Sequence, residues 1–322
     1  MTDLTRRHML GGAAALSIAG GFDMRLALAQ SPQAAAEGVH RFKVGDIEIV
    51  SILDGVRNVP LKTSPTRSAS LAEFQEALAL DGLSRDEINS VFHPLLVRTG
   101  GRLVMIDTGN GPRSLSAGTG LTAQRLAALG VDPKQIETVL ISHFHGDHIG
   151  GLVTMEGAPA FPNAEIKVPL DEWNYWLDDA NMSKSAEGSN LRNAHGNVRR
   201  VFGAIPGKSL TKYETGKEVA PGIVAMATPG HTPGHSCFII ASGPDKLLVQ
   251  ADVTSGIASV FVRHPDWFGG GDMDGPTAVA TRRKLYDMVT AEKMLMTGYH
   301  LPSPAVGRLE KSGAGYRFMP AA

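Results

Sequence analysis

Apolar and polar positions alternate along short segments near both ends of the chain. Residues 39–53 follow the period of two that is typical of strands, and Gly45-Asp46 predicts a hairpin turn within them. Other short apolar runs predict strands at 92–97, 102–106, 139–141, 163–168, 223–227, 236–241, 246–250 and 293–297. Helical patterns lie between these runs, so we expect two β-sheets packed face to face with helices outside.

Helical spacing is clearest where an apolar stripe follows a capping residue. Leu71, Phe74 and Leu78 share one face of a predicted helix, and Ser70 is placed to cap its start. The motif at 84–87 is typical of a capping box and predicts a short helix or turn. Further helices are predicted at 122–129, 170–177 and 276–289.

One segment breaks this pattern. In residues 178–209, Asn, Ser, Gly and charged residues dominate, with Arg192, Arg199 and Arg200 interspersed. Long loops in compact domains are usually lids or disordered, so we interpret 178–209 as an inserted, partly mobile segment near the mouth of a site. A solvated surface insertion without a role is an equal alternative. No internal boundary divides 39–322, which we predict to be a single domain.

The amino-acid composition narrows the classes of binding partner. The chain has 31 Lys and Arg against 32 Asp and Glu, so no excess of basic residues indicates a nucleic-acid partner. Its charged and apolar fractions, 20% and 43%, are those of an ordinary folded protein. The single cysteine, Cys237, excludes an intramolecular disulfide and falls in a predicted strand, which favours a buried, unreactive thiol.

The first residues resemble an export signal. Arg6 and Arg7 precede a weakly hydrophobic run of Gly and Ala, and small residues at 27–29 suit cleavage. We therefore predict a twin-arginine-type signal at 1–29, a flexible start of the mature chain at 30–38 and a periplasmic location. The apolar run is too short and too rich in Gly for stable membrane insertion. A disordered tail is the alternative.

Four candidate metal ligands lie within six residues after the strand at 139–141. They are His143, His145, Asp147 and His148. If the chain is extended at His143 and His145, both imidazoles point to the same side. The Asp-His pair comes as the chain turns, so the cluster can serve two metal ions. The alternative is a set of hydrogen-bonded histidines at a strand end, but this density of ligands favours metal.

This motif resembles the signature of the metallo-β-lactamase-fold hydrolases. Other fragments occur in the order expected for that family, namely Asp107-Thr-Gly, the Thr-Pro-Gly-His repeat at 228–235, Asp252 and Gly298-Tyr-His300. The resemblance covers roughly residues 40–320, and the downstream pattern is most similar to the branch containing methyl parathion hydrolase. It implies an α/β (α+β) fold, an αββα four-layer sandwich.

The resemblance also implies a ligand set for two divalent ions, most often Zn²⁺, with Mn, Fe or Co as alternatives. It assigns one metal to His143, His145 and His231, the other to Asp147, His148 and His300, and the bridge to Asp252, with Asp107 orienting a ligand from behind. Attack by a metal-bridging hydroxide on an aryl ester, phosphotriester or lactone is the implied reaction, with Asp147 and Asp252 in catalytic roles. We expect a small-molecule substrate, and a homodimer is compatible with the sequence.

Selection among substrates is expected to come from aromatic walls. We predict that Trp173, Trp176 and Phe261 line the substrate pocket, although core packing of a Trp is an alternative. Such walls would favour neutral aryl substrates over phosphomonoesters. A β-lactamase is a second enzyme hypothesis, against which Asp252 weighs. The assisting tyrosine of well-known lactonases is replaced here by Ser255. A non-catalytic periplasmic metal-binding protein is the alternative from another class.

Overall fold

The computed structural model describes residues 38–254 and 256–321. The predicted signal at 1–29, nearly all of the start at 30–38, and Ser255 lie outside the described residues. Two seven-stranded sheets form the centre of the molecule, and a two-stranded hairpin stands apart from them. Among the described residues, no helix is both long and apolar enough to cross a bilayer.

The first sheet joins the N-terminal hairpin to a parallel half. Its strands, in spatial order, are β1 (Val39–Val44), β2 (Ile47–Ile52), β5 (Leu95–Thr99), β6 (Arg102–Ile106), β7 (Thr138–Leu140), β8 (Glu165–Pro169) and β9 (Leu210–Tyr213). Pairing is antiparallel from β1 to β6 and parallel from β6 to β9. The predicted turn at Gly45-Asp46 is confirmed, because β1 and β2 flank it.

The second sheet follows the chain order without a break. It consists of β10 (Glu218–Ala220), β11 (Ile223–Ala227), β12 (Ser236–Ser242), β13 (Asp245–Val249), β14 (Leu295–Thr297), β15 (Val306–Ser312) and β16 (Gly315–Pro320). Only the β13–β14 pair is parallel among these, and the connection between them carries α7 (Ala258–Arg263) and α8 (Gly275–Ala291). Asp252 follows β13 and His300 follows β14, so the parallel pair brings two candidate ligands to the same edge of the sheet.

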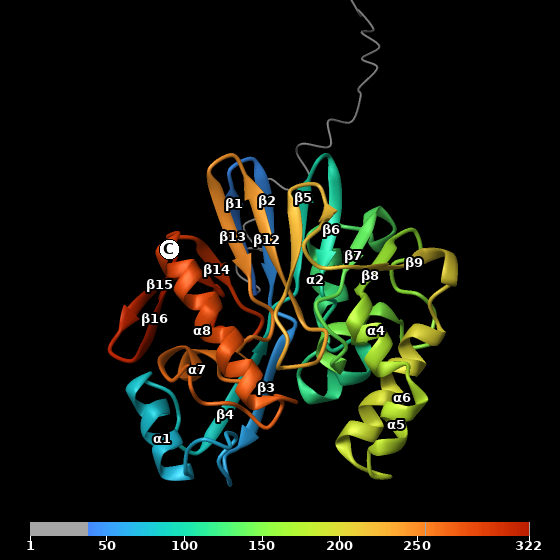
Figure 1. Cartoon of the computed structure of the whole chain (residues 1–322). Helices are drawn as coiled ribbons and strands as arrows, with labels where there is room; N and C mark the ends of the chain where they lie inside the picture. The colour runs from blue at the N-terminus through green and yellow to red at the C-terminus, as the bar shows by residue number, and fades with distance from the viewer. Residues whose placement is uncertain (1–37, 255, 322) are drawn as a thin grey trace, which may run out of the picture.

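Because side chains alternate between the two faces of each strand, the hydrophobic core is divided into three layers. On β5 and β6, Val97 and Val104 face the second sheet, where they meet residues such as Phe238. Their neighbours Leu96 and Met105 face the opposite way, toward the helices. The helices on that side are α2 (Thr122–Ala128), α4 (Leu170–Trp176), α5 (Asp179–Lys184) and α6 (Asn190–Gly203), whereas α8 and α7 cover the second sheet (Figure 1). The predicted helix–sheet–sheet–helix sandwich is confirmed.

The segment 178–209 differs from its prediction. It forms α5 and α6 instead of a long loop, and Ser189 caps α6 by accepting a hydrogen bond from the Arg192 backbone. Val198 and Val201 on α6 are fully buried in the core against the first sheet. Residue composition concealed this amphipathic pattern, because the apolar positions are few and lie among Asn, Arg and His.

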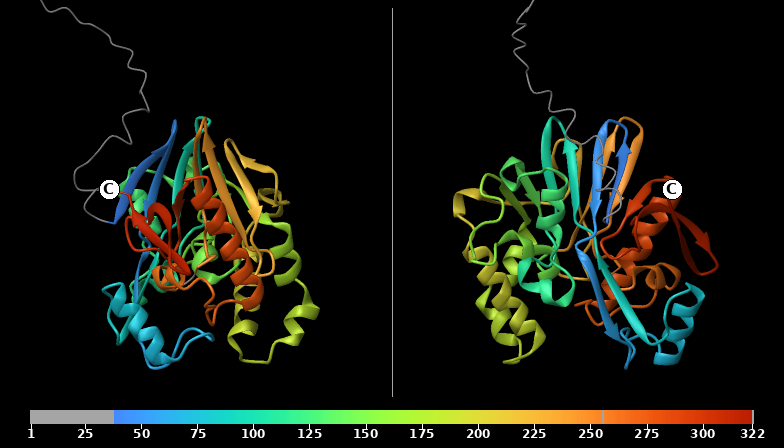
Figure 2. Two further views of the ribbon diagram at one scale, coloured as in Figure 1. Left: turned by 60° about the vertical axis from the view of Figure 1, so that its left-hand side comes forward. Right: turned by 180° about the vertical axis from the view of Figure 1, so that it is seen from behind.

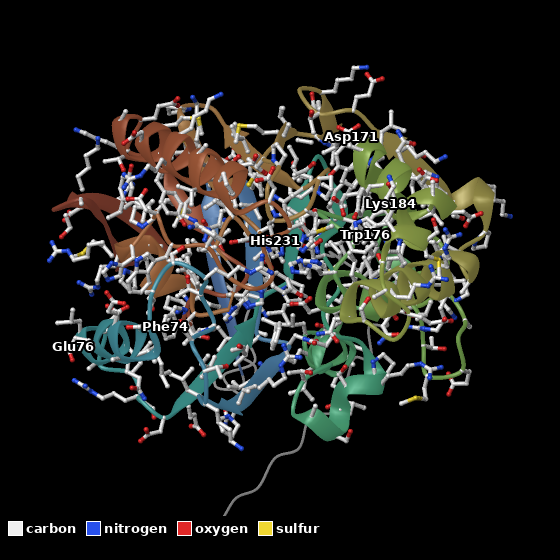
Figure 3. All side chains as sticks on the ribbon, turned by 60° about the horizontal axis from the view of Figure 1, so that its bottom comes forward. Phe74, Glu76, Asp171, Trp176, Lys184 and His231 are labelled. Atoms are coloured by element: carbon white, nitrogen blue, oxygen red, sulfur yellow. The ribbon has the colours of Figure 1, made fainter. Side chains whose placement is uncertain are left out.

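A second difference concerns the region before β5. The motif at 84–87 leads into a strand, because β4 (Glu87–Phe92) pairs with β3 (Gly55–Pro60) as a separate hairpin. The helix α1 (Leu71–Leu80) is confirmed, with the Ser70 capping box formed. This hairpin and α1 lie at the same end of the molecule as α5 and α6, on the opposite side (Figure 2). Seen from that end, His231 lies near the middle, between Phe74 on one side and Lys184 on the other (Figure 3).

The buried thiol prediction is also consistent with the structure. Cys237 lies on β12 with no exposed surface, and its Sγ is within hydrogen-bond distance of the Gln250 carbonyl. Burial raises the pKa of the Cys237 thiol to about 12, so the thiolate that reacts with electrophiles is disfavoured.

Candidate metal centre

Two histidines lie close together in the segment between β7 and the short helix α3 (Gly146–Ile149). The chain is extended at His145, which occupies the position just before α3, and the side chain of His143 points to the same side. Nε2 of His143 lies 3.1 Å from Nδ1 of His145. The spacing predicted from the alternation of strand side chains is therefore present in the structure.

His231 joins this pair from the loop between β11 and β12. Its Nε2 lies 2.9 Å from Nδ1 of His145, and one nitrogen from each of the three imidazoles falls within 4.8 Å of the others. Burial lowers the pKa of His145 to about 3, and burial also holds the pKa of His143 well below its usual value. These two imidazoles are therefore neutral and offer lone pairs, the form that binds a metal ion.

The second group lies beside the first. Asp147, His148, Asp252 and His300 each place one ligand atom within 4.8 Å of the others. Oδ2 of Asp147 lies 3.6 Å from Nε2 of His300 and 3.8 Å from Nε2 of His148. His148 follows Asp147 directly in α3, whereas Asp252 and His300 come from loops after β13 and β14. The four residues thus reach one point from three parts of the chain.

Asp252 lies between the two groups. Its Oδ2 is 3.3 Å from Nε2 of His231 in the first group and 3.1 Å from Nε2 of His300 in the second. Its Oδ1 lies 3.2 Å from Nε2 of His148. A single carboxylate therefore faces ligand nitrogens of both groups, which is the geometry expected of a bridging ligand.

Orphaned polar atoms show that these residues fit a cation. Nε2 of His148 and Oδ1 of Asp252 are buried and form no hydrogen bond, although they lie 3.2 Å apart. Leaving such atoms unsatisfied costs free energy unless another group completes them. Burial opposes protonation of His148, but the carboxylates of Asp252 and Asp107 outweigh it and raise its pKa. The second group thus attracts positive charge, as a divalent ion would supply.

Outer partners fix most of the imidazoles. Asp107 lies at the end of β6 and its Oδ2 is 2.8 Å from Nδ1 of His148. The same carboxylate accepts hydrogen bonds from the backbone and hydroxyl of Ser142, each at 2.8 Å. His300 donates through Nδ1 to the carbonyl of Val91 at 2.8 Å. Asp107 therefore lies behind the ligands, as the sequence predicted, and leaves Nε2 of His148 facing the centre.

Sequence reasoning missed an equivalent partner for His231. Oδ1 of Asp272 lies 2.9 Å from Nδ1 of His231, and its Oδ2 accepts a hydrogen bond from the Gly269 backbone. The guanidinium of Arg282, fully buried in α8, lies 3.7 Å from that Oδ2. Asp272 follows three glycines, and its distance from His231 in the sequence gave no signal of this contact.

A buried carboxylate also ties the ligand loops together. Glu172 on α4 accepts hydrogen bonds from the backbone of Phe144 at 3.0 Å and of Gly234 at 2.8 Å. Phe144 separates the two histidines of the first group, and Gly234 belongs to the loop that carries His231. Glu172 therefore sets the distance between the two loops, although nothing in its local sequence predicts that role.

Two glycines after α3 bring another loop close. A Cβ on Gly150 would lie 2.2 Å from the Asn110 carbonyl, and one on Gly151 would lie 2.1 Å from the Thr108 carbonyl. No larger residue fits without moving the backbone. The loop after β6 can therefore press against α3, where the backbone of Thr108 donates to the His148 carbonyl at 2.8 Å.

Two of the three aromatic residues predicted to line the substrate pocket lie in the core. Trp176 and Phe261 are buried, with 0% and 4% of their surfaces exposed, in different core clusters. Trp176 donates to Glu172, and Phe261 packs on Phe74 of α1. Trp173 is half-buried beside Phe202 with the Lys212 ammonium over its ring. Each aromatic ring is therefore engaged in packing, which is the alternative that the sequence left open for a Trp.

His235 is a packed residue and belongs to neither group. Its Nε2 accepts a hydrogen bond from the backbone of Asp252 at 3.1 Å, and its Nδ1 faces Thr228. It thereby helps to place Asp252. All seven predicted ligands come together in two groups, and Asp107 lies behind them.

Comparison with known proteins places this geometry in a family. The sequence profile of the Metallo-beta-lactamase superfamily matches residues 94–290, more than half of the chain. This chain belongs to the metallo-β-lactamase superfamily. The predicted superfamily is thus confirmed, whereas the methyl parathion hydrolase branch stays a prediction.

Curated relatives match only in part. An N-acyl homoserine lactonase of Bacillus sp is 26% identical over 174 residues, which cover 53% of this chain and 58% of the lactonase. YobT of Bacillus subtilis (strain 168), described as uncharacterized, is 29% identical over 109 residues, 33% of this chain and 42% of YobT. The chain spans about half the length of these curated relatives.

Solved superfamily structures match more completely. AidC, a dizinc quorum-quenching lactonase solved with a product, has a TM-score of 0.81 and 27% identity, with 88% of this chain and 98% of AidC covered. The hydrolase AbOPH has a TM-score of 0.80 and 24% identity, with the same coverage. AbOPH supports the fold alone, since its identity is low.

Proposed function

We propose that this superfamily member is a binuclear metal-dependent hydrolase that cleaves an ester-like bond, with lactones as the best supported substrates. The observation that carries the proposal is Asp252, whose carboxylate faces ligand nitrogens of both groups at 3.1–3.3 Å. A site for one metal would have no use for a shared carboxylate in this position. Seven converging donors are also too many for one tetrahedral site.

The donor set supports zinc. Three imidazoles in one group, and two imidazoles with two carboxylates in the other, are ligands that Zn²⁺ binds at about 2.0–2.2 Å. Mn, Fe and Co accept similar mixtures of nitrogen and oxygen ligands. When bound, two such ions lower the pKa of water from about 15.7 towards 7 and polarise the oxygen of the substrate.

The residues of the chain position these groups and handle protons. Asp252 holds the two ligand sets at a fixed separation, while Asp107 and Asp272 set the orientation of one imidazole in each. Asp147 is only partly buried, and its carboxylate borders open space as well as the histidines. We assign it the transfer of a proton to the leaving group. Tyr299 donates its hydroxyl to the Asp147 carbonyl at 2.6 Å and so fixes this residue in place.

Support for lactones as substrates comes from the similarity of this chain to proteins named as lactonases. AidC and the lactonase of Bacillus sp are named as lactonases, and AidC matches the chain over most of its length. Aryl esters and phosphotriesters share the same electrophilic chemistry and remain part of the proposal. Their expected preference depended on an aromatic wall, and the burial of Trp176 and Phe261 removes that argument.

A substrate panel tests this function. The purified protein, loaded with zinc, is assayed with an N-acyl homoserine lactone, p-nitrophenyl acetate, a dialkyl p-nitrophenyl phosphate and a β-lactam. We expect hydrolysis of the lactone and the ester, and loss of both activities after chelation. Tight metal binding without turnover of any of the four would instead support the non-catalytic alternative, and fastest turnover of the β-lactam would support the β-lactamase.

We also propose export by the twin-arginine route, from the sequence of residues 1–29. The test is a folded reporter fused to residues 1–35, with Arg6 and Arg7 intact or both replaced by Lys. Periplasmic reporter is expected only with the arginines, and equal export of both fusions would contradict the proposal.

A further inference from the structure

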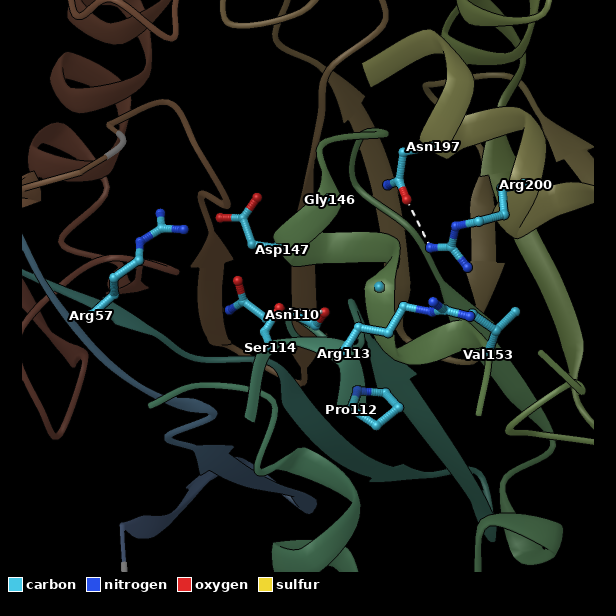
Figure 4. A pocket seen from close by; sticks show the side chains of 11 residues that line it. Arg57, Asn110, Pro112, Arg113, Ser114, Gly146, Asp147, Val153, Asn197 and Arg200 are labelled. Atoms are coloured by element: carbon cyan, nitrogen blue, oxygen red, sulfur yellow. Dashed lines mark hydrogen bonds between the residues drawn. The ribbon is translucent and has the colours of Figure 1, made fainter. Parts of the chain in front are cut away.

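A polar hollow opens beside the second ligand group. It has a volume of about 350 Å³, and Asp147 forms part of its wall together with three arginines, Arg57, Arg113 and Arg200 (Figure 4). The arginines come from β3, from the turn of 3₁₀-helix at Pro112–Ala117, and from α6. In Figure 4, Asp147 lies between Arg57 on one side and Arg113 and Arg200 on the other. Three separate elements thus bring positive charge to one space.

The charge of these arginines is not compensated. In the part of the chain that the structure describes, none of the three lies within ion-pair distance of a carboxylate, whereas other surface arginines such as Arg85 and Arg317 do. Asp147 is the one acidic side chain among the described residues that line the hollow, and it faces the histidines. Partial burial and the charge of Arg113 both lower the pKa of Arg200. An anion between these arginines would relieve that repulsion.

Contacts within α6, to β4 and around the loop before Arg113 hold the arginines near the hollow. The Arg57 guanidinium lies over the Phe92 ring, 5.2 Å from its centre, and Arg200 donates to Asn197 at 2.7 Å. The loop before Arg113 is anchored by buried Asp54, which accepts hydrogen bonds from the backbone of Asn110. Such contacts reduce the side-chain entropy that is lost when a ligand binds.

The hollow also adjoins the metal centre. Asp147 belongs to both, and the Phe92 ring that supports Arg57 lies 5.2 Å from the ring of His300. A group bound among the arginines is therefore close to any bond that is cleaved at the centre. Guanidinium groups bind carboxylates and phosphates through paired hydrogen bonds. A neutral substrate has no anionic group to accept such a pair.

We propose that the hollow formed around Arg57, Arg113 and Arg200 binds an oxyanion group of the substrate, so that the preferred ester or lactone carries a carboxylate or phosphate near the bond that is cleaved. This inference rests on the proposed hydrolase function and deepens it. It reverses the expectation of a neutral, aromatic pocket. If these arginines were solvated surface residues without a role, the protein would show no preference for a substrate that carries an anionic group.

The kinetic test compares two substrates that differ in one charge. Mono-p-nitrophenyl glutarate carries a carboxylate, and methyl p-nitrophenyl glutarate is its neutral counterpart. We expect kcat/KM to favour the carboxylate form by roughly tenfold or more, since hydrogen bonds to charged groups are strong. The double variant Arg113→Gln/Arg200→Gln should lose that preference, so that the kcat/KM values for the two esters become similar. Arg102→Gln, exposed and outside the hollow, removes a charge elsewhere and should change neither value.

A binding test gives a readout independent of turnover. Calorimetry measures the Kd of the zinc-loaded protein for glutarate, inorganic phosphate and glutaramide. Glutarate and phosphate distinguish the two oxyanions, and glutaramide, the neutral diamide of glutarate, reports on binding without an anionic group. In the double variant, the Kd for the preferred anion should rise by roughly tenfold, and that for glutaramide should stay unchanged.

The outcomes separate this inference from the proposed function. Equal kcat/KM ratios and equal Kd values in wild type and double variant would overturn the role of the arginines while leaving the hydrolase intact. Hydrolysis of neither ester, together with the expected loss of anion binding, would instead overturn the hydrolase and leave an oxyanion site. If the double variant fails to fold, both measurements are made on the single variant Arg57→Gln. An unchanged ratio of kcat/KM values and an unchanged Kd for the anion in that variant would also contradict the inference.

Discussion

The metal centre and the arginine hollow share Asp147 but are built in opposite ways. In the centre, His143 and His148 are fully buried, and outer partners such as Asp107 fix the ligands. Around the hollow, Arg57, Arg113 and Arg200 are exposed, and they are held by single contacts. Burial and outer partners give the exact geometry that metal chemistry needs. Exposed arginines beside the metal centre can select a substrate without disturbing the geometry of the ligands.

The largest effect should come from the residue on which both ligand groups depend. Asp252→Ala removes a carboxylate that faces three ligand imidazoles, so we expect kcat/KM to fall by at least about 10³-fold. Elemental analysis should show less than the wild-type metal content. Asp245→Ala, at the exposed start of the strand that precedes Asp252, is the matched control and should keep full activity. Near-normal turnover of Asp252→Ala would refute the bridging assignment.

A smaller effect should come from an outer partner of the centre. Asp272→Asn weakens the hydrogen bond that orients His231, and loss of such partners typically costs about 10–100-fold in metal affinity or activity. Competition with a chelator measures the affinity. The control is Asp274→Asn, two residues away, because Asp274 caps α8 and does not contact His231. Equal chelator resistance in both variants would show that Asp272 does not position the ligand.

Selection by the hollow should depend on salt, whereas the centre should not. The Debye length falls from about 10 Å at 0.1 M salt to about 3 Å at 1 M, and exposed arginines are screened accordingly. We therefore expect the preference for the carboxylate-bearing ester to decrease several-fold over this range, with little change for its neutral counterpart. A preference that is constant with salt would place the source of selectivity in the buried centre.

The smallest effect on catalysis should come from the aromatic residues first predicted to line the pocket. Phe261 packs on Phe74 in a buried cluster, so Phe261→Leu should lower the free energy of unfolding by about 1 kcal/mol. The ratio of kcat/KM for aryl and alkyl esters should not change. A changed ratio would return Phe261 to the substrate pocket.

The fold and the ligands could be predicted because their signals are local or follow strand ends. His143, His145 and His148 lie within six residues, and Asp252 and His300 follow apolar runs that form β13 and β14. The alternation of apolar side chains gave the two sheets. The family resemblance supplied the assignment of ligands to two groups, which spacing alone left open.

The remaining features depend on contacts between distant segments. Asp272 orients His231 across 41 residues of chain. Arg57 and Arg200 line the same hollow only because α6 and the β3–β4 pair reach the same end of the molecule. Aromatic residues were misassigned because Trp176 and Phe261 suit a core as well as a pocket. Sequence composition also hid α6, whose buried residues are spaced among polar ones.

One titration tests the central claim that two metals held around Asp252 form the hydrolytic site. Protein stripped by a chelator receives Zn²⁺ in steps while hydrolysis of an N-acyl homoserine lactone is followed. We expect no activity without metal and a rate that reaches its maximum at two equivalents per chain. Full activity at one equivalent, or hydrolysis by the stripped protein, would contradict the account.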